Sequence, residues 1–192
     1  MNRAQLLRRG VAGSALLAGS GAFAAVANAA PSDADLAALR LVIATELLKL
    51  DFATSAIGSG KADGPTTRLL HQMHADDTAH YNGLASLFTG AGQTPATAAD
   101  IDFSYPSGTF ASSRSIAKAV WELATTSLGA YLGALGTVQT PRFKLPLAQI
   151  AANEAQQVSA AGALGNGPMV GAAFAPALNA DQVTTFLDVY ES

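Results

Sequence analysis

Cysteine is absent from the 192 residues of the chain. No disulfide can therefore support the fold, and a domain of this size must rest on its hydrophobic core. No serine or cysteine stands in a nucleophile turn, so the sequence does not support a catalytic triad. No apolar run of membrane length follows residue 29, so no membrane span is expected after the leader described next.

The first 29 residues have the pattern of an export signal. Three arginines precede a mildly apolar run, and small residues close it at 27–29. This arrangement is typical of a signal peptide with an A-x-A cleavage site. The pair Arg8 and Arg9 favours the twin-arginine route. We therefore expect residues 1–29 to be a signal peptide and residues 30–192 to form one domain exported to the periplasm, the cell envelope or the medium.

Removal of this leader makes the remaining chain acidic. It takes away three arginines and no acidic residue, and it leaves 8 basic and 14 acidic side chains. The resulting net charge of −6 disfavours nucleic acid and anionic membrane surfaces as partners. The sequence leaves a homodimer open, identifies no partner protein and does not favour an iron-storage cage.

Apolar residues recur at helical spacing in the remainder of the chain, which predicts an all-α fold. Capping residues, prolines and glycines mark the helix ends. We predict four long helices and a short C-terminal one: from Ser32 or Asp33 to Gly58, from Asp63 to Gly90, from Ser112 or Ser113 to Val138, from Leu145–Pro146 to about Asn166, and from Ala180 to Tyr190.

About twenty irregular residues, 91–111, separate the second and third helices. A loop this long is uncommon in a compact domain unless it has a specific purpose. Extended, it reaches about 65 Å, whereas a 25-residue helix is about 38 Å long. The loop can thus return along the whole bundle and make the third helix parallel to the second. One long crossover at this point indicates a ferritin-like four-helix bundle.

Several polar side chains fall on the predicted core faces of three helices. In the second helix, Asp77 lies at the centre of the apolar stripe, and His80 lies about 60° away on the same face. Glu46 lies within the apolar stripe of the first helix. Glu154 and Gln157 share the inner face of the fourth. Each residue alone is consistent with an ordinary core or rim position, but together they predict one interior polar site, because isolated buried charges are costly.

On these residues the chain resembles the ferritin-like family that includes the desiccation-related proteins of plants and their exported bacterial relatives. The resemblance spans roughly residues 33–190. Besides the polar residues, it rests on segments in suitable order: 103–110, 129–133, 173–178 and 183–187. It implies a four-helix bundle whose helices supply carboxylate and histidine ligands for a metal pair.

The chain departs from that family pattern in three helices. Gln157 stands in place of the histidine of the fourth helix, and an amide is a weak ligand for a transition metal. Asp77 replaces a longer glutamate. In the third helix Ala124 stands at the centre of the inner face, and Glu122 lies about 200° away. We therefore expect Glu122 to face solvent and a complete dinuclear site to be missing.

Two functions remain open. The first is an exported, non-catalytic bundle with a degenerate metal site, associated with stress or the cell envelope. The alternative is an iron- or manganese-binding protein with oxidase or peroxide-handling activity, with one ion favoured over two. In that case the ligands are Glu46, Asp77, His80 and Glu154, with Gln157 binding the ion or one of these ligands. The sequence does not decide whether the protein is an enzyme.

Overall fold

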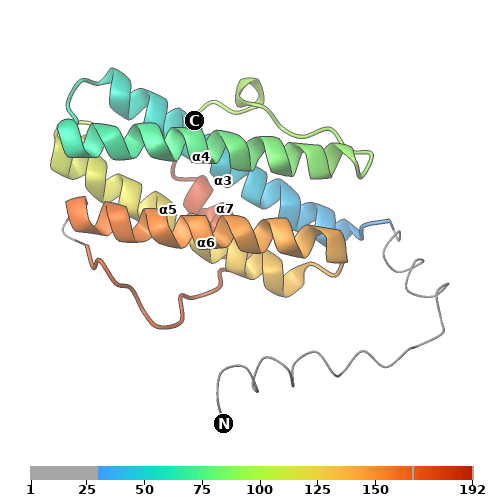
Figure 1. Ribbon diagram of the computed structural model, residues 1–192. Coiled ribbons are helices and arrows are strands. Elements are labelled where there is room, and N and C mark those ends of the chain that lie inside the picture. The colour runs from blue at the N-terminus through green and yellow to red at the C-terminus, as the bar shows by residue number, and fades with distance from the viewer. Residues whose placement is uncertain (1–29, 166, 192) are drawn as a thin grey trace, which may run out of the picture.

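A computed structural model describes residues 30–165 and 167–191 and shows a bundle of long helices. The predicted signal peptide, residues 1–29, lies outside the described residues. Figure 1 shows the long helices packed side by side, with a short helix against them. In chain order the elements are α3 (Asp33–Gly58), α4 (Gly64–Thr89), the single 3₁₀ turn η1 (Ala98–Asp100), α5 (Ser113–Thr137), α6 (Pro141–Gly165) and α7 (Ala180–Leu187).

Most helices begin at the capping residues that the sequence predicts. The side chains of Ser32, Asp63, Ser112 and Asn179 each accept a hydrogen bond from the backbone N–H three residues later. These bonds satisfy N–H groups that have no partner inside the helix. Local sequence therefore determines where α3, α4, α5 and α7 begin.

The crossover makes α5 parallel to α4, as the sequence predicts. Both helices begin at the same end of the bundle, because the Asp63 N–H donates to Ser113 Oγ at 3.1 Å and the hydroxyls of Thr66 and Ser113 lie 2.9 Å apart. In Figure 1 the chain leaves the far end of α4 and returns along the bundle before α5 begins. The fold is thus a ferritin-like helical bundle.

Two predicted helix boundaries are wrong. Helix α6 begins at Pro141 rather than at Leu145–Pro146. The cause lies in another helix: the carboxylate of Asp35 in α3 accepts hydrogen bonds from the backbone N–H groups of Gln139 (2.7 Å) and Thr140 (3.1 Å). This fixes the chain just before α6, and Pro141 has a backbone suited to a first helical position.

The second wrong boundary is the end of α7, which stops at Leu187 instead of Tyr190. The backbone C=O of Tyr190 accepts a hydrogen bond from Ser104 N–H at 2.7 Å, which joins the chain end to the crossover. The Tyr190 ring also packs near Tyr105, with ring centroids 5.9 Å apart. These contacts compete with continuation of the helix.

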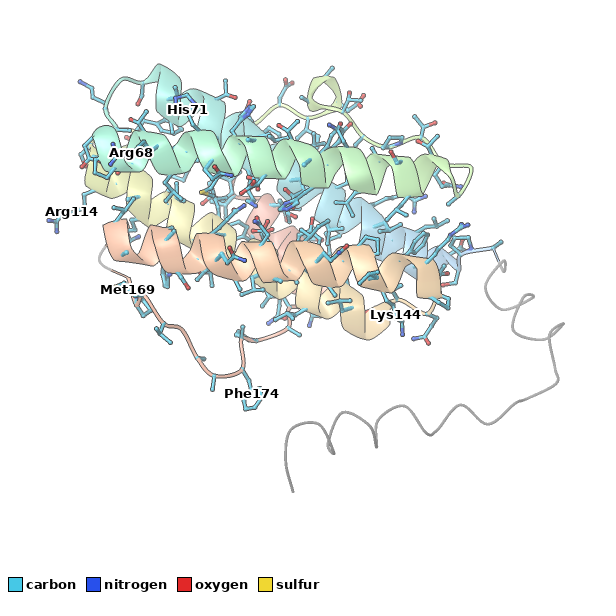
Figure 2. The ribbon with its side chains drawn as sticks, in the orientation of Figure 1. Arg68, His71, Arg114, Lys144, Met169 and Phe174 are labelled. Atoms are coloured by element: carbon cyan, nitrogen blue, oxygen red, sulfur yellow. The ribbon has the colours of Figure 1, made fainter. Side chains whose placement is uncertain are left out.

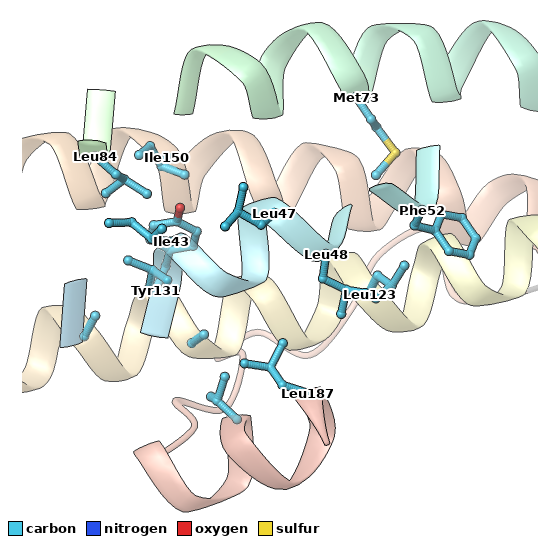
Figure 3. Close-up of a cluster of buried hydrophobic side chains, with 14 of the residues drawn as sticks. Ile43, Leu47, Leu48, Phe52, Met73, Leu84, Leu123, Tyr131, Ile150 and Leu187 are labelled. Carbon is cyan, nitrogen blue, oxygen red and sulfur yellow. The ribbon is translucent and has the colours of Figure 1, made fainter. Parts of the chain in front are cut away.

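The core is a continuous cluster of apolar side chains between the four long helices, part of which Figure 3 shows. Helix α3 packs against α4, α5 and α7 and is accordingly buried on several sides. Tyr131 of α5 lies fully buried in this cluster. Within the part of the chain that the structure describes, no helix is long and apolar enough to cross a membrane.

Candidate functional site

Four predicted site residues meet in the interior of the bundle. Glu46 of α3, Asp77 and His80 of α4, and Glu154 of α6 each offer one ligand atom, and these atoms lie within 4.8 Å of one another. The three carboxylates are fully buried, and the His80 side chain is 11 % exposed. The structure thus brings the four side chains together, while their role as metal ligands stays a prediction.

A lysine that the sequence analysis missed lies among these carboxylates. Lys49 Nζ is 2.8 Å from Asp77 Oδ1, 2.5 Å from Glu154 Oε1 and 3.8 Å from Glu46 Oε2. Its side chain is 2 % exposed. An ammonium group therefore lies where these carboxylates would hold a metal ion.

Lys49 was missed because lysine normally indicates a solvent-facing position. A signal was nevertheless present in the sequence. Lys49 follows Glu46 by three residues and Val42 by seven, so all three share the inner side of α3. A basic residue on the same face as three predicted interior acids is their expected counter-ion.

Two further residues complete the polar layer, which we define as Glu46, Lys49, Asp77, His80, Tyr131, Glu154 and Gln157. The Tyr131 hydroxyl donates to Glu46 Oε1 at 2.5 Å. The Gln157 amide N–H donates to Asp77 Oδ1 at 2.9 Å, so Gln157 holds a carboxylate through its nitrogen.

The third long helix supplies no acid to this layer, as the sequence predicts. Ala124 is fully buried. Glu122 lies on the outside of α5, where its side chain is 39 % exposed and pairs with Lys118 at 2.7 Å. Tyr131, seven residues after Ala124 on the same face, is the contribution of α5. Its hydroxyl is uncharged, because burial first and then the nearby Glu46 raise the pKa of Tyr131 well above its ordinary value.

The proton affinities of the layer follow from burial and charge. Burial alone would lower the pKa of Lys49, but Glu154, Glu46 and Asp77 outweigh it and raise that pKa above its ordinary value. Burial likewise opposes protonation of His80, yet its interactions with Glu154 and Glu46 raise the His80 pKa to about 9. Both side chains are therefore cationic at neutral pH.

The carboxylates respond in opposite ways. Burial raises the pKa of Asp77 to about 7, even though Lys49 acts to lower it. Burial also acts to raise the pKa of Glu154, but Lys49 and His80 outweigh it, so the net shift is downward. Glu154 is thus ionised, and Asp77 holds a proton for part of the time at neutral pH.

This balance tests whether a metal ion fits. Lys49 and His80 supply two positive charges to three carboxylates. Partial protonation of Asp77 at neutral pH offsets part of the remaining negative charge. A protonated lysine or histidine has no lone pair for a metal. A divalent ion would have to displace Lys49 and remove the His80 proton. With these two cations in place, the residues present do not fit a resident metal ion.

Burial also limits what the polar layer can do chemically. Glu46, Asp77 and Glu154 are fully enclosed, so a small molecule can approach the layer only at the partly exposed His80. The effect of the layer is structural: its ion pairs connect α3 to α4 and α6, and the hydrogen bond from Tyr131 to Glu46 connects α5 to α3. The remaining histidines lie apart from this cluster: His71 is exposed and His74 is half-buried.

Comparison with known proteins agrees with this architecture. A family model for the ferritin-like domain matches residues 22–166, which is more than half of the chain. The match includes all of α3, α4, α5 and α6, the helices that carry the polar layer. A search of curated proteins finds no match. With its bundle, its crossover and its interior carboxylates, the chain belongs to the ferritin-like domain family.

Proposed function

We propose that this protein is an exported, non-catalytic ferritin-like bundle in which Lys49 takes the place of the metal ion. The observation that carries the proposal is the position of Lys49 Nζ, 2.8 Å from Asp77 Oδ1 and 2.5 Å from Glu154 Oε1. The role is then structural or binding, associated with stress or the cell envelope, rather than redox catalysis.

The physical support is that the ammonium group performs the electrostatic task of a cation. Buried carboxylates need a positive partner, and removal of that partner is strongly unfavourable. Lys49 supplies this charge as part of the chain, so folding does not depend on capture of a metal. Its position between two carboxylates also takes up the space that an open coordination site for oxygen or peroxide would need.

The proposed location rests on the amino-terminal pattern. A basic start, a mildly apolar run and small residues at 27–29 support export, and the Arg8–Arg9 pair supports the twin-arginine route. The desiccation-related subgroup is proposed on the order of its soft motifs, which include the crossover segment 103–110 and the closing segment 183–187.

One observation favours the alternative, a single iron or manganese ion. Glu46 Oε2, Asp77 Oδ2 and Glu154 Oε2 are buried and have no hydrogen-bond partner among the described residues. Such oxygens are costly unless a cation or a proton satisfies them. In our proposal, the positive charge of His80, whose Nδ1 lies 3.6 Å from Glu46 Oε2, and the partial protonation of Asp77 meet part of this need by electrostatic attraction, without a hydrogen bond from His80 Nδ1.

Elemental analysis of protein purified from the exported fraction distinguishes the two functions. We expect less than about 0.1 equivalent of iron, manganese or zinc per chain, and no rise in Tm when these ions are added, because a ligand stabilises a fold only if it binds the native state. About one equivalent of metal that is lost in Glu154→Gln would overturn the proposal and establish the alternative. Glu122→Gln, on the outside of α5, is the matched control.

A further inference from the structure

The loop between α6 and α7 stands away from the bundle and exposes large apolar side chains. Figure 1 shows the chain leave the end of α6 and bow outward before it reaches α7. Met169 is 65 % exposed, Val170 87 % and Phe174 93 %. In Figure 2 Phe174 points away from the helices, with Met169 on the same loop. Single exposed apolar residues are ordinary, but three on one loop form a patch that indicates an interaction surface.

The loop is attached to α5 at both ends. At its start, a Cβ at Gly167 would lie 3.1 Å from the Trp121 ring. At its end, Leu178 N–H donates to Gly129 C=O at 2.9 Å. Between these attachments, residues 171–176 lie over the outer faces of α5 and α6. The exposed apolar side chains are therefore presented on one side of the bundle.

The helix faces beneath this loop carry exposed basic side chains. On α5, Trp121 faces the loop, and Lys118 and Arg114 precede it by three and seven residues, so they share its face. On α6, Ala151 faces the loop, and Lys144 precedes it by seven residues on the same face. The three basic side chains are exposed.

One acidic and one further apolar side chain belong to the same helix faces. Glu122 pairs with Lys118 at 2.7 Å and offsets its charge, whereas Arg114 and Lys144 add positive charge. Leu145, next to Lys144, is 67 % exposed. We define the loop face by its exposed basic and apolar side chains: Arg114, Lys118, Lys144, Leu145, Met169, Val170 and Phe174.

Charge is distributed unevenly between this side of the molecule and the remainder. Residues 113–180 contain four basic and two acidic side chains, and one of those acids, Glu154, is enclosed in the polar layer. The other residues from 30 to 192 contain four basic and twelve acidic side chains. The acidic net charge of the chain without its leader therefore comes from α3, α4, the crossover and the C-terminal end. It does not exclude an anionic partner at the loop face.

We propose that the loop face docks on a lipid surface that carries anionic headgroups. Met169, Val170 and Phe174 enter the interfacial region of the bilayer, and Arg114 and Lys144 lie near the headgroup phosphates. Apolar and basic side chains on one face are the two features by which peripheral proteins bind anionic membranes. A symmetric pair of chains would instead bring two positive loop faces together, so charge favours the lipid surface over a second copy.

This inference rests on the proposed association with the cell envelope, to which it adds the partner, and it does not depend on a metal-free polar layer. Protein purified from the exported fraction is sedimented with vesicles of phosphatidylcholine alone or mixed with phosphatidylglycerol. We expect binding to the mixed vesicles that weakens with added salt, and weaker binding to phosphatidylcholine alone. Metal content is measured on the same sample, so the docking and the metal-free layer can fail independently.

One pair of variants tests the apolar contribution. Phe174→Ala should weaken binding to both kinds of vesicle about tenfold, because the ring no longer leaves water. It should keep Tm, because the side chain is 93 % exposed in the free protein. Val189→Ala is the matched control, since Val189 is 56 % exposed but adjoins Tyr190, which binds the crossover. This control should bind as the wild type does.

A second pair tests the charge. Lys144→Gln should weaken binding to the mixed vesicles about fivefold and leave binding to phosphatidylcholine unchanged. Arg68→Gln, on α4 and across the bundle from Phe174 in Figure 2, should bind as the wild type does. Absence of binding to the mixed vesicles, wild-type binding by Phe174→Ala or Lys144→Gln, or an equal loss in a control would overturn the proposal. Self-association that Phe174→Ala abolishes, without vesicle binding, would overturn it in favour of a second copy.

Discussion

Lys49 and its carboxylate partners are buried together, so neither has water as an alternative partner. The energetic consequence differs from that of a surface ion pair. Loss of one member of a buried pair leaves an uncompensated charge and costs about 3–5 kcal/mol, whereas an exposed pair contributes about 1 kcal/mol or less. The chain contains both kinds: Lys49 with Asp77 and Glu154, and Lys118 with Glu122, whose side chains are 65 % and 39 % exposed.

Lys49→Met should lower the free energy of unfolding by about 3–5 kcal/mol, because three buried carboxylates lose their main cation. Added Mn²⁺ should restore part of the loss, since the space and the carboxylates are then available to a metal. Denaturant unfolding with and without Mn²⁺ measures both effects.

Lys118→Met is the control for that experiment, and it should change stability by less than about 1 kcal/mol. A Lys49→Met protein as stable as the wild type would contradict the charge-replacement account. A Lys49→Met protein that is destabilised but does not respond to Mn²⁺ would show instead that the carboxylates cannot hold a metal even when the lysine is removed.

At the scale of elements, the segment after α6 depends on close backbone contact with α5. A Cβ at Gly133 would lie 1.9 Å from the backbone oxygen of Leu178. Backbone atoms cannot rotate aside as a flexible side-chain end can, so the contact requires glycine. This position, together with the hydrogen bond from Leu178 N–H to Gly129 C=O, fixes where α7 begins and therefore how it packs on α3 and α5.

Gly133→Ala should therefore destabilise the protein by about 1–3 kcal/mol through steric strain, although alanine is the better helix former. The loss of stability should be concentrated in residues 171–187. Hydrogen exchange should therefore accelerate there, relative to the wild type, more than it does in α4. Gly83→Ala is the matched control: Gly83 is an exposed helical glycine with nothing within 4 Å of a Cβ, so this change should stabilise by roughly 0.5–1 kcal/mol. Equal effects of the two substitutions would refute the contact argument.

The same elements show which parts of the fold were predictable. Ser32, Asp63, Ser112 and Asn179 cap their helices through neighbours three residues away, so local sequence was sufficient. The start of α6 was predicted incorrectly because its partner, Asp35, lies more than one hundred residues earlier in the chain. Pro141 was a local signal for this start, but the hydrogen bonds that Asp35 accepts from Gln139 and Thr140 depend on the tertiary fold.

The site was predictable to a similar extent. Periodicity placed Glu46, Asp77, His80 and Glu154 on inner faces, and the structure brings them together. It also left α5 without an acid. Lys49 was not predicted, because lysine side chains normally face solvent and only its spacing from Glu46 places it on the inner side of α3.

At the scale of the whole molecule, the polar layer links stability to pH. Between its ordinary value of 3.8 and about 7, Asp77 binds protons more tightly in the folded than in the unfolded chain. His80 does the same between 6.5 and about 9. Where the folded state binds more protons, stability falls as pH rises. Glu154 acts in the opposite direction, because its lowered pKa removes stability only as pH falls below about 4.5.

We therefore expect Tm to be highest near pH 5 and to decrease steadily toward pH 9, measured by circular dichroism at constant ionic strength. His80→Gln should flatten the decrease between pH 6.5 and 9, because it removes the group that holds a proton beside Glu46, Asp77, Glu154 and Lys49. His71→Gln, on the exposed face of the same helix (Figure 2), should keep the wild-type slope. A Tm that rises from pH 5 to 9, or a slope that persists in His80→Gln, would contradict the proton distribution derived for the layer. A positively charged His80 at neutral pH is also the condition under which it cannot bind a metal, so this profile tests the electrostatic basis of the metal-free proposal without adding any metal.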